Sequence, residues 1–317
     1  MQQGDIQNRG HEPMAEERVV YLNGELVPNS QAKISIHDYG FLMGDAVFDT
    51  TRTFARQIFK LHEHLDRFYR SLKYMRLDPG LSKSEMAELT MQVLETNLPL
   101  LQEKSDYWVT QRVTRGERVY DGPGAGELKP TVLIECQPLP FAARAKYYRD
   151  GLPVVIPSVR RTPPESMSPR AKVHNYINLV QGELEVKAQN PDAWAILLDV
   201  NGNIAEGMGS NFFIVKEGVV MTPRDQYVLG GISRETVLEL AAQLQFETKE
   251  ADIDLFDAYT AEEAFVTSTS FCICPVVSIN GSTVGEGHIP GPVTSRLLQA
   301  YSELVGLDIR EQYLSHL

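Results

Sequence analysis

The sequence predicts an α+β protein, because β-hairpin signals and amphipathic helical patterns both recur along its 317 residues. The first hairpin signal is Asn23-Gly24, which separates two short apolar runs. The first helical pattern begins near His62 and continues to Asp78-Pro79-Gly80, a sequence that ends helices. A hydrophobic content of 43% is sufficient for a substantial core, in either one large domain or two modest ones.

The remaining elements follow in order along the chain. A second helix is expected over residues 82–98, because Ser82 and Glu85 have the spacing of a capping box. Strands at 107–113 and 131–136 flank a segment rich in Gly, Pro and charge, which favours a long functional loop over 117–129. The second half predicts strands at 152–159, 194–200, 211–215, 264–267 and 275–279, and helices at 174–188, 232–246 and 292–304.

The composition argues against several classes of protein and site. A formal net charge of −12 argues against nucleic acid or an anionic membrane surface as a partner. No run approaches the roughly 18 apolar residues of a membrane span. The cysteines, Cys136, Cys272 and Cys274, form no disulfide-like framework, which favours a reducing, cytoplasmic compartment. No metal site is expected, because neither His62 and His64 nor the cysteines have further ligands nearby.

Four polar segments are candidates for chemistry, although each also has a simpler structural explanation. Lys172 follows a proline-rich segment and precedes a predicted helix, where a lysine is usually solvated but could form a Schiff base if its neighbours position it. Glu206 lies among glycines after a strand, as a turn residue or as a buried anion for a protonated ring nitrogen. Gly230-Gly231 precede a helix whose free N–H groups could hold a phosphate. The hydroxyl-rich run at 267–270 is typical of a turn.

Taken together and in this order, these segments resemble the fold-type IV enzymes that use pyridoxal 5′-phosphate (PLP). This family includes branched-chain and D-amino-acid aminotransferases, (R)-amine transaminases and aminodeoxychorismate lyase. The resemblance extends from about residue 19 to residue 301. It rests mainly on Leu-Asp-Val-Asn-Gly-Asn-Ile-Ala-Glu-Gly-Met-Gly-Ser-Asn-Phe at 198–212 and Leu-Gly-Gly-Ile-Ser-Arg at 229–234, with support from the motifs at 44–48, 63–67 and 291–294.

The resemblance implies a role for three residues around the pyridoxal ring. Lys172 is similar to the catalytic lysine that holds PLP as a Schiff base and transfers the substrate proton. Tyr176, four residues later, is similar to the residue that donates a hydrogen bond to the phenolic oxygen. Glu206 is similar to the carboxylate that keeps the ring nitrogen protonated.

The resemblance also implies a phosphate site. Arg67 is similar to the arginine that binds the phosphate, together with the N–H groups of Ile232 and Ser233. Thr269 would complete the cup, and Ser233 replaces a more usual threonine while keeping a hydroxyl. Arg67 lies off the apolar stripe of its helix, so periodicity alone predicts a solvated side chain.

A two-domain architecture is implied as well. We expect a small N-terminal α+β domain over 18–137 and a larger C-terminal domain over 151–317. An interdomain loop is expected over 138–150, because Pro138-Leu139-Pro140 open this segment. Residues 1–17 lack the apolar core of a secretory signal and predict a disordered polar extension. In this family a loop from a second subunit completes the active site, which predicts a homodimer with the site at its interface.

Substrate recognition is expected from the apolar surface of Phe48 and Phe271 and from several polar groups near them. Arg52 resembles branched-chain aminotransferases and the lyase, whereas Arg118-Val119-Tyr120 resembles the Arg-X-His carboxylate site of D-amino-acid enzymes. The full set of expected substrate contacts is Met43, Phe48, Thr50, Arg52, Arg118, Tyr120, Ser270 and Phe271.

These residues predict a transaminase that moves an amino group from a hydrophobic, branched-chain-like amino acid or amine to a 2-oxo acid such as 2-oxoglutarate or pyruvate. The alternatives are (R)-amine or D-amino-acid transamination, and the elimination of pyruvate by an aminodeoxychorismate lyase.

Overall fold

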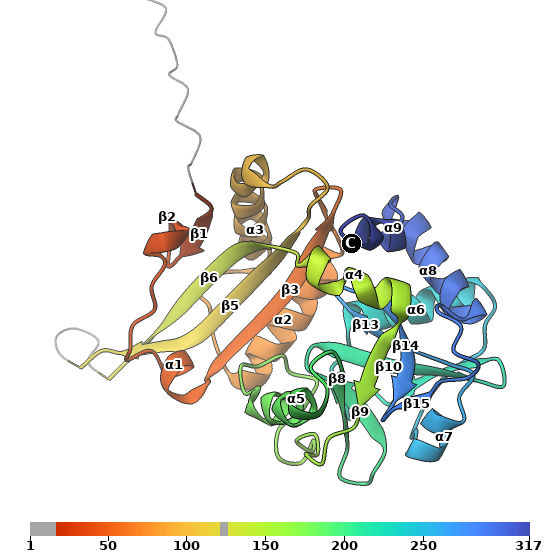
Figure 1. The fold of residues 1–317 in the computed structure, drawn as a ribbon. Helices are drawn as coiled ribbons and strands as arrows, with labels where there is room; N and C mark the ends of the chain where they lie inside the picture. Colours follow the sequence, from red (N-terminus) through yellow and green to blue (C-terminus); the bar gives the residue numbers. More distant parts are fainter. Residues whose placement is uncertain (1–16, 121–125) are drawn as a thin grey trace, which may run out of the picture.

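The computed structural model describes residues 17–120 and 126–317, and in this part of the chain two β-sheets organise the fold (Figure 1). The first sheet is antiparallel throughout. Its described strands are, in spatial order, β2 (Glu25–Pro28), β1 (Val19–Leu22), β6 (Leu128–Pro138), β5 (Tyr107–Arg118), β3 (Ala46–Phe54) and β4 (Gln57–Ile58). The predicted Asn23-Gly24 turn joins β1 to β2. Both residues have positive φ, as the hairpin turn favoured by Asn-Gly requires.

Two helices cover one face of this sheet (Figure 1). Helix α2 (Leu61–Met75) buries Leu61, Leu65, Phe68 and Leu72 at helical spacing. Helix α3 (Lys83–Asn97) begins at Ser82, whose side chain accepts from the N–H of Glu85 while Glu85 bonds back to the N–H of Ser82. The predicted capping box is therefore confirmed. Short elements complete this half: α1 (Tyr39–Met43), η1 (Asn29–Gln31) and η2 (Leu98–Leu100).

The second sheet curls until its last strand, β9, meets β10, the third strand from the other end. Its described strands run in the order β12 (Thr248–Ala251), β11 (Val219–Pro223), β10 (Ser210–Lys216), β13 (Glu263–Ser268), β14 (Cys272–Ile279), β7 (Leu152–Val155), β8 (Trp194–Leu198) and β9 (Ile204–Gly207), with β15 (Ser282–Thr283) beside β14. Because β9 also pairs with β10, the strands from β10 to β9 form a closed ring. Around it lie α5 (Ile177–Gln189), α6 (Ile232–Gln243), α7 (Leu255–Tyr259), α8 (Pro292–Val305) and α9 (Ile309–Leu314).

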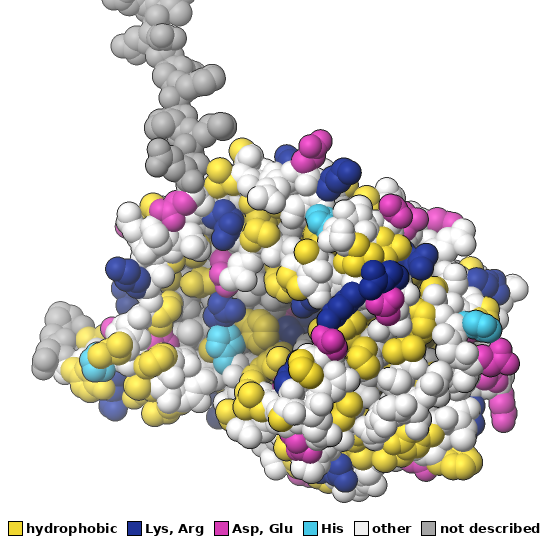
Figure 2. All heavy atoms as spheres, viewed as in Figure 1, with side chains coloured by type: hydrophobic (Ala, Val, Ile, Leu, Met, Phe, Trp, Pro, Cys, Tyr) yellow, Lys and Arg dark blue, Asp and Glu magenta, His cyan; other side chains and the backbone are white. Residues whose placement is uncertain are grey.

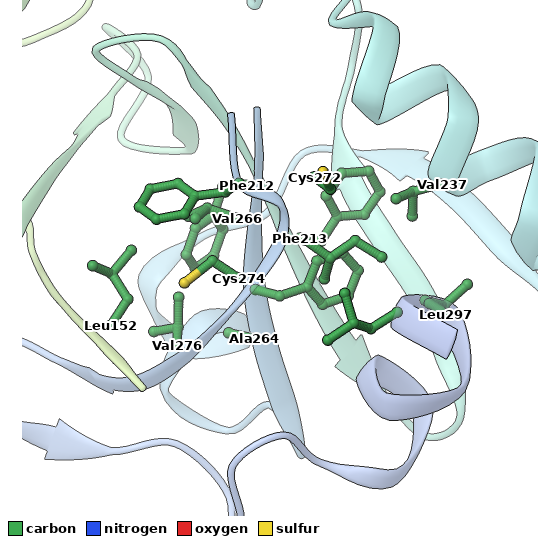
Figure 3. Close-up of a cluster of buried hydrophobic side chains, with 14 of the residues drawn as sticks. Leu152, Phe212, Phe213, Val237, Ala264, Val266, Cys272, Cys274, Val276 and Leu297 are labelled. Atoms are coloured by element: carbon green, nitrogen blue, oxygen red, sulfur yellow. The ribbon is translucent and has the colours of Figure 1, made fainter. Parts of the chain in front are cut away.

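Apolar side chains from the second sheet and its helices form the largest described core (Figure 3). Phe212 and Phe213 on β10, Val266 on β13 and Val276 on β14 are all nearly inaccessible to solvent. Consecutive residues of β10 are buried because both faces of this strand are covered, so the strand has an apolar run rather than an alternating pattern.

The connection between the sheets differs from the prediction. Residues 138–150 were expected to be a loop, but Phe141–Asp150 form helix α4. Phe141, Ala145 and Tyr148 are buried at helical spacing, and both prolines precede the helix, where they do not interrupt its hydrogen bonds. The loop expected at 117–129 is also shorter, because β5 extends to Arg118 and β6 begins at Leu128.

Other boundaries agree to within a few residues. The helix expected from residue 174 begins at Ile177, and the last long helix runs from Pro292, as predicted. Residues 1–16 of the expected extension lie outside the described residues. Among residues 17–120 and 126–317, no helix combines the length and the apolar character that crossing a membrane requires.

Candidate active site

Lys172 is fixed by its own backbone between the two halves of the chain. Its N–H donates to Ser71 Oγ at 3.1 Å, and its C=O accepts from the N–H of Phe48 at 3.1 Å. The side-chain Nζ lies 3.4 Å from Tyr176 OH and 4.6 Å from the centroid of the Phe48 ring. No carboxylate in the described part of the chain forms an ion pair with Lys172, so its amine is available to another partner.

Glu206 is a buried carboxylate near this lysine. It lies on β9 with 5% of its surface exposed, and both residues line one small cavity. Its Oε1 accepts from Arg161 Nε at 2.9 Å, and its Oε2 accepts from the N–H of Leu229 at 2.9 Å. These two contacts orient the carboxylate but use fewer lone pairs than it has, so it can accept a further donor. Arg161 is thus the ion-pair partner of a buried carboxylate.

Arg67 is buried rather than solvated, in contrast to what helical periodicity predicts. Its guanidinium donates to both oxygens of Asp49, at 2.8 and 2.6 Å, and to the C=O of Gly230 at 3.0 Å. His64 lies 2.8 Å from the same carboxylate. Burial raises the pKa of Asp49, but Arg67 and His64 outweigh this effect and hold the pKa well below its usual range. Arg67 is therefore a cation held in place at the wall of the cavity.

The N-terminus of α6 reaches the same cavity. Ile232 and Ser233 occupy its first turn, and the N-cap residue Gly231 makes no side-chain capping bond, so the first N–H groups remain available. A Cβ atom at Gly231 would lie 2.1 Å from Asn211 Oδ1, which explains the need for glycine. Thr269 lines the cavity from the β13–β14 turn.

The residues around this cavity fit PLP. The hydroxyls of Ser210 and Thr267 are buried without a hydrogen-bond partner, and both line the cavity. Buried polar groups are usually satisfied, so these hydroxyls indicate a polar occupant. A phosphate would find the first N–H groups of α6 and Arg67, an amine would be available for a covalent bond at Lys172, and Glu206 would face a protonated nitrogen.

A second cavity of about 320 Å³ lies beside the first and shares Lys172 with it. Three of the predicted substrate residues line it, namely Phe48, Thr50 and Ser270. Tyr176 also reaches it, with its ring centroid 5.6 Å from that of Phe48. Cofactor-type and substrate-type residues are thus brought together around one amine.

Other predicted substrate residues lie elsewhere. Arg52 is 1% exposed, and it bonds to the C=O of Ser270 at 3.0 Å and to Gln312 and Asp106. Its long side chain points into the interior from β3 because a buried carboxylate, Asp106, compensates its charge there. Phe271 does not line the cavity either, because its ring packs in the core.

Met43, Arg118 and Tyr120, which were also predicted to contact the substrate, do not line the cavity of their own chain. Met43 and Tyr120 are 64% and 71% exposed, and Arg118 is also exposed at the end of β5. Strand β5 ends at Arg118, and neither Arg118 nor Tyr120 lines the cavity of about 320 Å³ beside Lys172.

Several cavity residues were missed by the sequence analysis. Trp108, Thr110 and Arg112 alternate along β5 and line the cavity together. Their spacing of two residues is the signal that could have placed them on one face of a strand. Arg144 of α4 had no such signal, since α4 was expected to be a loop, and Trp194 is the first residue of the predicted strand at 194–200.

Comparison with known proteins agrees with this site. A family model described as amino-transferase class IV matches residues 46–279, which include Lys172, Glu206 and the start of α6. The chain belongs to the class IV aminotransferases. This class IV aminotransferase is 35% identical over 288 residues to a putative branched-chain-amino-acid aminotransferase of Methanocaldococcus jannaschii, with 90% of this chain and 96% of the relative covered. It is also 28% identical to a D-alanine aminotransferase of Bacillus licheniformis, with 89% and 95% covered.

Solved structures give the same family. The branched-chain amino acid aminotransferase of Escherichia coli superposes with a TM-score of 0.82 at 29% identity, covering 92% of this chain and 95% of that one. A branched-chain amino acid aminotransferase from T.th., solved with N-(5′-phosphopyridoxyl)-L-glutamate, gives a TM-score of 0.80 at 28% identity, with 92% and 94% covered. The fold-type IV architecture expected from the sequence is confirmed.

Proposed function

We propose that this class IV aminotransferase uses PLP to move an amino group from a hydrophobic, branched-chain-like amino acid or amine to a 2-oxo acid. The observation that carries the proposal is the position of Lys172. Its side chain borders both the cavity with Arg67, Glu206 and the α6 N-terminus and the cavity of about 320 Å³ beside it. An amine at this junction can serve both a bound cofactor and a substrate.

Each residue has a distinct role in this proposal. When bound, PLP supplies an electron-withdrawing ring that stabilises negative charge at the substrate carbon. Lys172 would hold the cofactor covalently, and its Nζ, when free, would move a proton at the substrate α-carbon. Glu206, oriented by Arg161, accepts a hydrogen bond from the ring nitrogen. Tyr176 donates to the phenolic oxygen close to Nζ.

The phosphate group has its own binding set. Arg67 and the first N–H groups of α6, at Ile232 and Ser233, bind the phosphate, and the hydroxyl of Thr269 contributes from the opposite side. Because Asp49 holds the Arg67 guanidinium at two oxygens, the arginine is oriented before the cofactor binds. This preorganisation reduces the entropy that binding would otherwise cost.

The walls of the larger cavity support an apolar substrate side chain. Phe48, Trp108, Trp194 and Met208 line it, and aromatic and thioether groups favour hydrocarbon over water. The branched-chain aminotransferases among the relatives and solved structures support the same choice. D-amino-acid transamination is a second candidate, because the D-alanine aminotransferase is similar over nearly the same length.

Half-reactions test this proposal. We expect L-leucine, L-isoleucine and L-valine to remove the yellow absorbance of the loaded enzyme without an acceptor, and 2-oxoglutarate or pyruvate to restore it. Colour loss with D-amino acids or (R)-amines alone would move the substrate class to the second candidate or to the amine transaminases. Release of pyruvate from aminodeoxychorismate over many turnovers, without colour loss by any donor, would show a lyase instead.

We also propose that the chain acts as a homodimer in the cytoplasm, with the segment around Arg118 and Tyr120 reaching the partner's cavity. Exposed apolar side chains support an interface: Ile34, Ile36, Phe41, Leu42 and Met43 gather near α1, where Figure 2 shows hydrophobic surface. Such a cluster on one side of the molecule is typical of an interaction surface. The three free cysteines fit a reducing compartment. Light scattering at the mass of one chain, 35.6 kDa, would contradict the dimer.

A further inference from the structure

Arg144 places a guanidinium in the wall of the larger cavity. It lies on α4, the helix that joins the two sheets, and it lines the cavity together with Lys172. Three aromatic rings surround its guanidinium carbon, which lies 5.1 Å from the centroid of Trp108, 5.7 Å from that of Trp194 and 4.7 Å from that of Phe271. Stacking on these rings fixes the position of the planar group while leaving its N–H donors free to bond.

No carboxylate compensates this cation within the described part of the chain. The other guanidinium of the cavity, Arg112, forms an ion pair with Glu135 at 3.0 Å and donates to His174 at 3.0 Å. Arg144, in contrast, donates to the neutral hydroxyl of Ser270 and has no ion pair among residues 17–120 and 126–317. A guanidinium has five N–H donors, so most of its capacity remains.

Leaving this cation unpaired has a cost. Burial lowers the pKa of Arg144, which is the direction expected when a charged form loses water without gaining an anion. Arg144 is only partly exposed, and charges that lose water are normally paired, so a negatively charged occupant would complete the site. Amino acids and 2-oxo acids both bring a carboxylate to this cavity, whereas simple amines do not.

We propose that Arg144 binds a carboxylate of the amino-acid and 2-oxo-acid substrates and thereby selects acids over simple amines. This inference rests on the proposed aminotransferase function and names the group that recognises its substrates. A planar guanidinium can donate two parallel hydrogen bonds to a carboxylate. Phe48, which lines the same cavity next to Lys172, is then available to contact the apolar side chain of the substrate.

Binding of inert acids tests the proposal without catalysis. The PLP-loaded enzyme is titrated calorimetrically with 4-methylvalerate and with 4-methylvaleramide, its neutral counterpart, neither of which has an amino or oxo group. We expect the wild type to bind the acid more tightly. In Arg144→Gln, the preference for the acid should fall about 10- to 100-fold, as expected for the loss of charge-assisted hydrogen bonds. Arg149→Gln, on the same helix but exposed and paired with Asp150, is the matched control and should keep the preference.

Glutarate distinguishes the two carboxylates that substrates can offer. A loss of affinity for both 4-methylvalerate and glutarate assigns Arg144 to the α-carboxylate, and a loss for glutarate alone assigns it to the distal carboxylate of a dicarboxylic acceptor. If Arg144→Gln does not fold, Arg144→Lys carries the test, because it keeps the charge but loses the second parallel donor. A folded, loaded variant that keeps both the preference for 4-methylvalerate over its amide and the affinity for glutarate would overturn the proposal. A wild type that binds both acids but transaminates no amino acid would instead contradict the proposed function.

Discussion

Replacement of Asp49 by Asn tests how Arg67, the arginine proposed to bind the phosphate, is held. Asp49 is inaccessible to solvent, and its two oxygens accept from Arg67 at 2.8 and 2.6 Å. Asparagine has nearly the same shape but only one acceptor oxygen and no charge. The change would therefore leave the buried Arg67 guanidinium with the C=O of Gly230 and one neutral amide oxygen, without the charge of the carboxylate it now contacts.

The expected cost follows from burial. Removal of one partner of a buried ion pair destabilises a protein by about 3–5 kcal/mol, whereas loss of an exposed pair costs about 0–1 kcal/mol. Asp66 provides the matched control, because its partner Lys83 and Asp66 itself are about half exposed. We therefore predict that Asp49→Asn lowers the free energy of unfolding by about 3 kcal/mol or more, and Asp66→Asn by about 1 kcal/mol at most.

Urea unfolding of the cofactor-free proteins at several pH values measures this difference. The pKa of Asp49 is held well below its usual range, so its contribution is fully present above the unfolded pKa of about 4 and is lost as the pH falls toward the folded value. The gap between wild type and Asp49→Asn should thus narrow as the pH falls from about 6 to 3. Equal stabilities of the two Asp variants, or a gap that does not depend on pH, would refute the reasoning.

Two further substitutions probe the cavity directly. Glu206→Gln should keep the cofactor but lower kcat by about 10- to 1000-fold, which corresponds to about 1.4–4 kcal/mol of activation free energy. The reason is that a neutral amide cannot stabilise a protonated ring nitrogen. Near wild-type turnover would remove Glu206 from the mechanism. Gly231→Ala should weaken PLP binding and lower Tm, because its Cβ would overlap Asn211 Oδ1 and force the α6 N-terminus to shift at a cost of about 1–3 kcal/mol. Unchanged cofactor affinity, measured by fluorescence titration, would show that this N-terminus does not hold the phosphate.

Local signals in the sequence predicted most elements correctly. The Asn23-Gly24 turn and the Ser82 capping box depend on neighbouring residues, so a single stretch of sequence contains the information. Helix α4 was missed because the prolines before Phe141 suggested a loop, although they only precede the helix. The lengths of β5 and β6 were underestimated because their ends are set by pairing with each other, which is a long-range property.

The site likewise combines features that local sequence predicts with features that depend on long-range contacts. Motifs predicted residues that line the cavity around Lys172, but the environment of each arginine depends on a partner far away in the sequence. Arg67 is buried because Asp49 of β3 neutralises it, and Arg161 is partly buried because it meets Glu206 of β9. Arg52 was expected in the cavity, yet Asp106 and Gln312 hold it in the interior. No spacing rule along one segment reveals such pairs.

The most direct test of the central claim is to identify the lysine that binds PLP. The loaded enzyme is reduced with borohydride, digested and mapped by mass spectrometry, with Lys172→Ala as the control. The structure predicts that the pyridoxyl group is found on Lys172 and that the variant carries none, because the Nζ of Lys172 borders the cavity with Glu206, Arg67 and the α6 N-terminus. A pyridoxyl group on any other lysine of the wild type would contradict the assignment of this cavity as the active site.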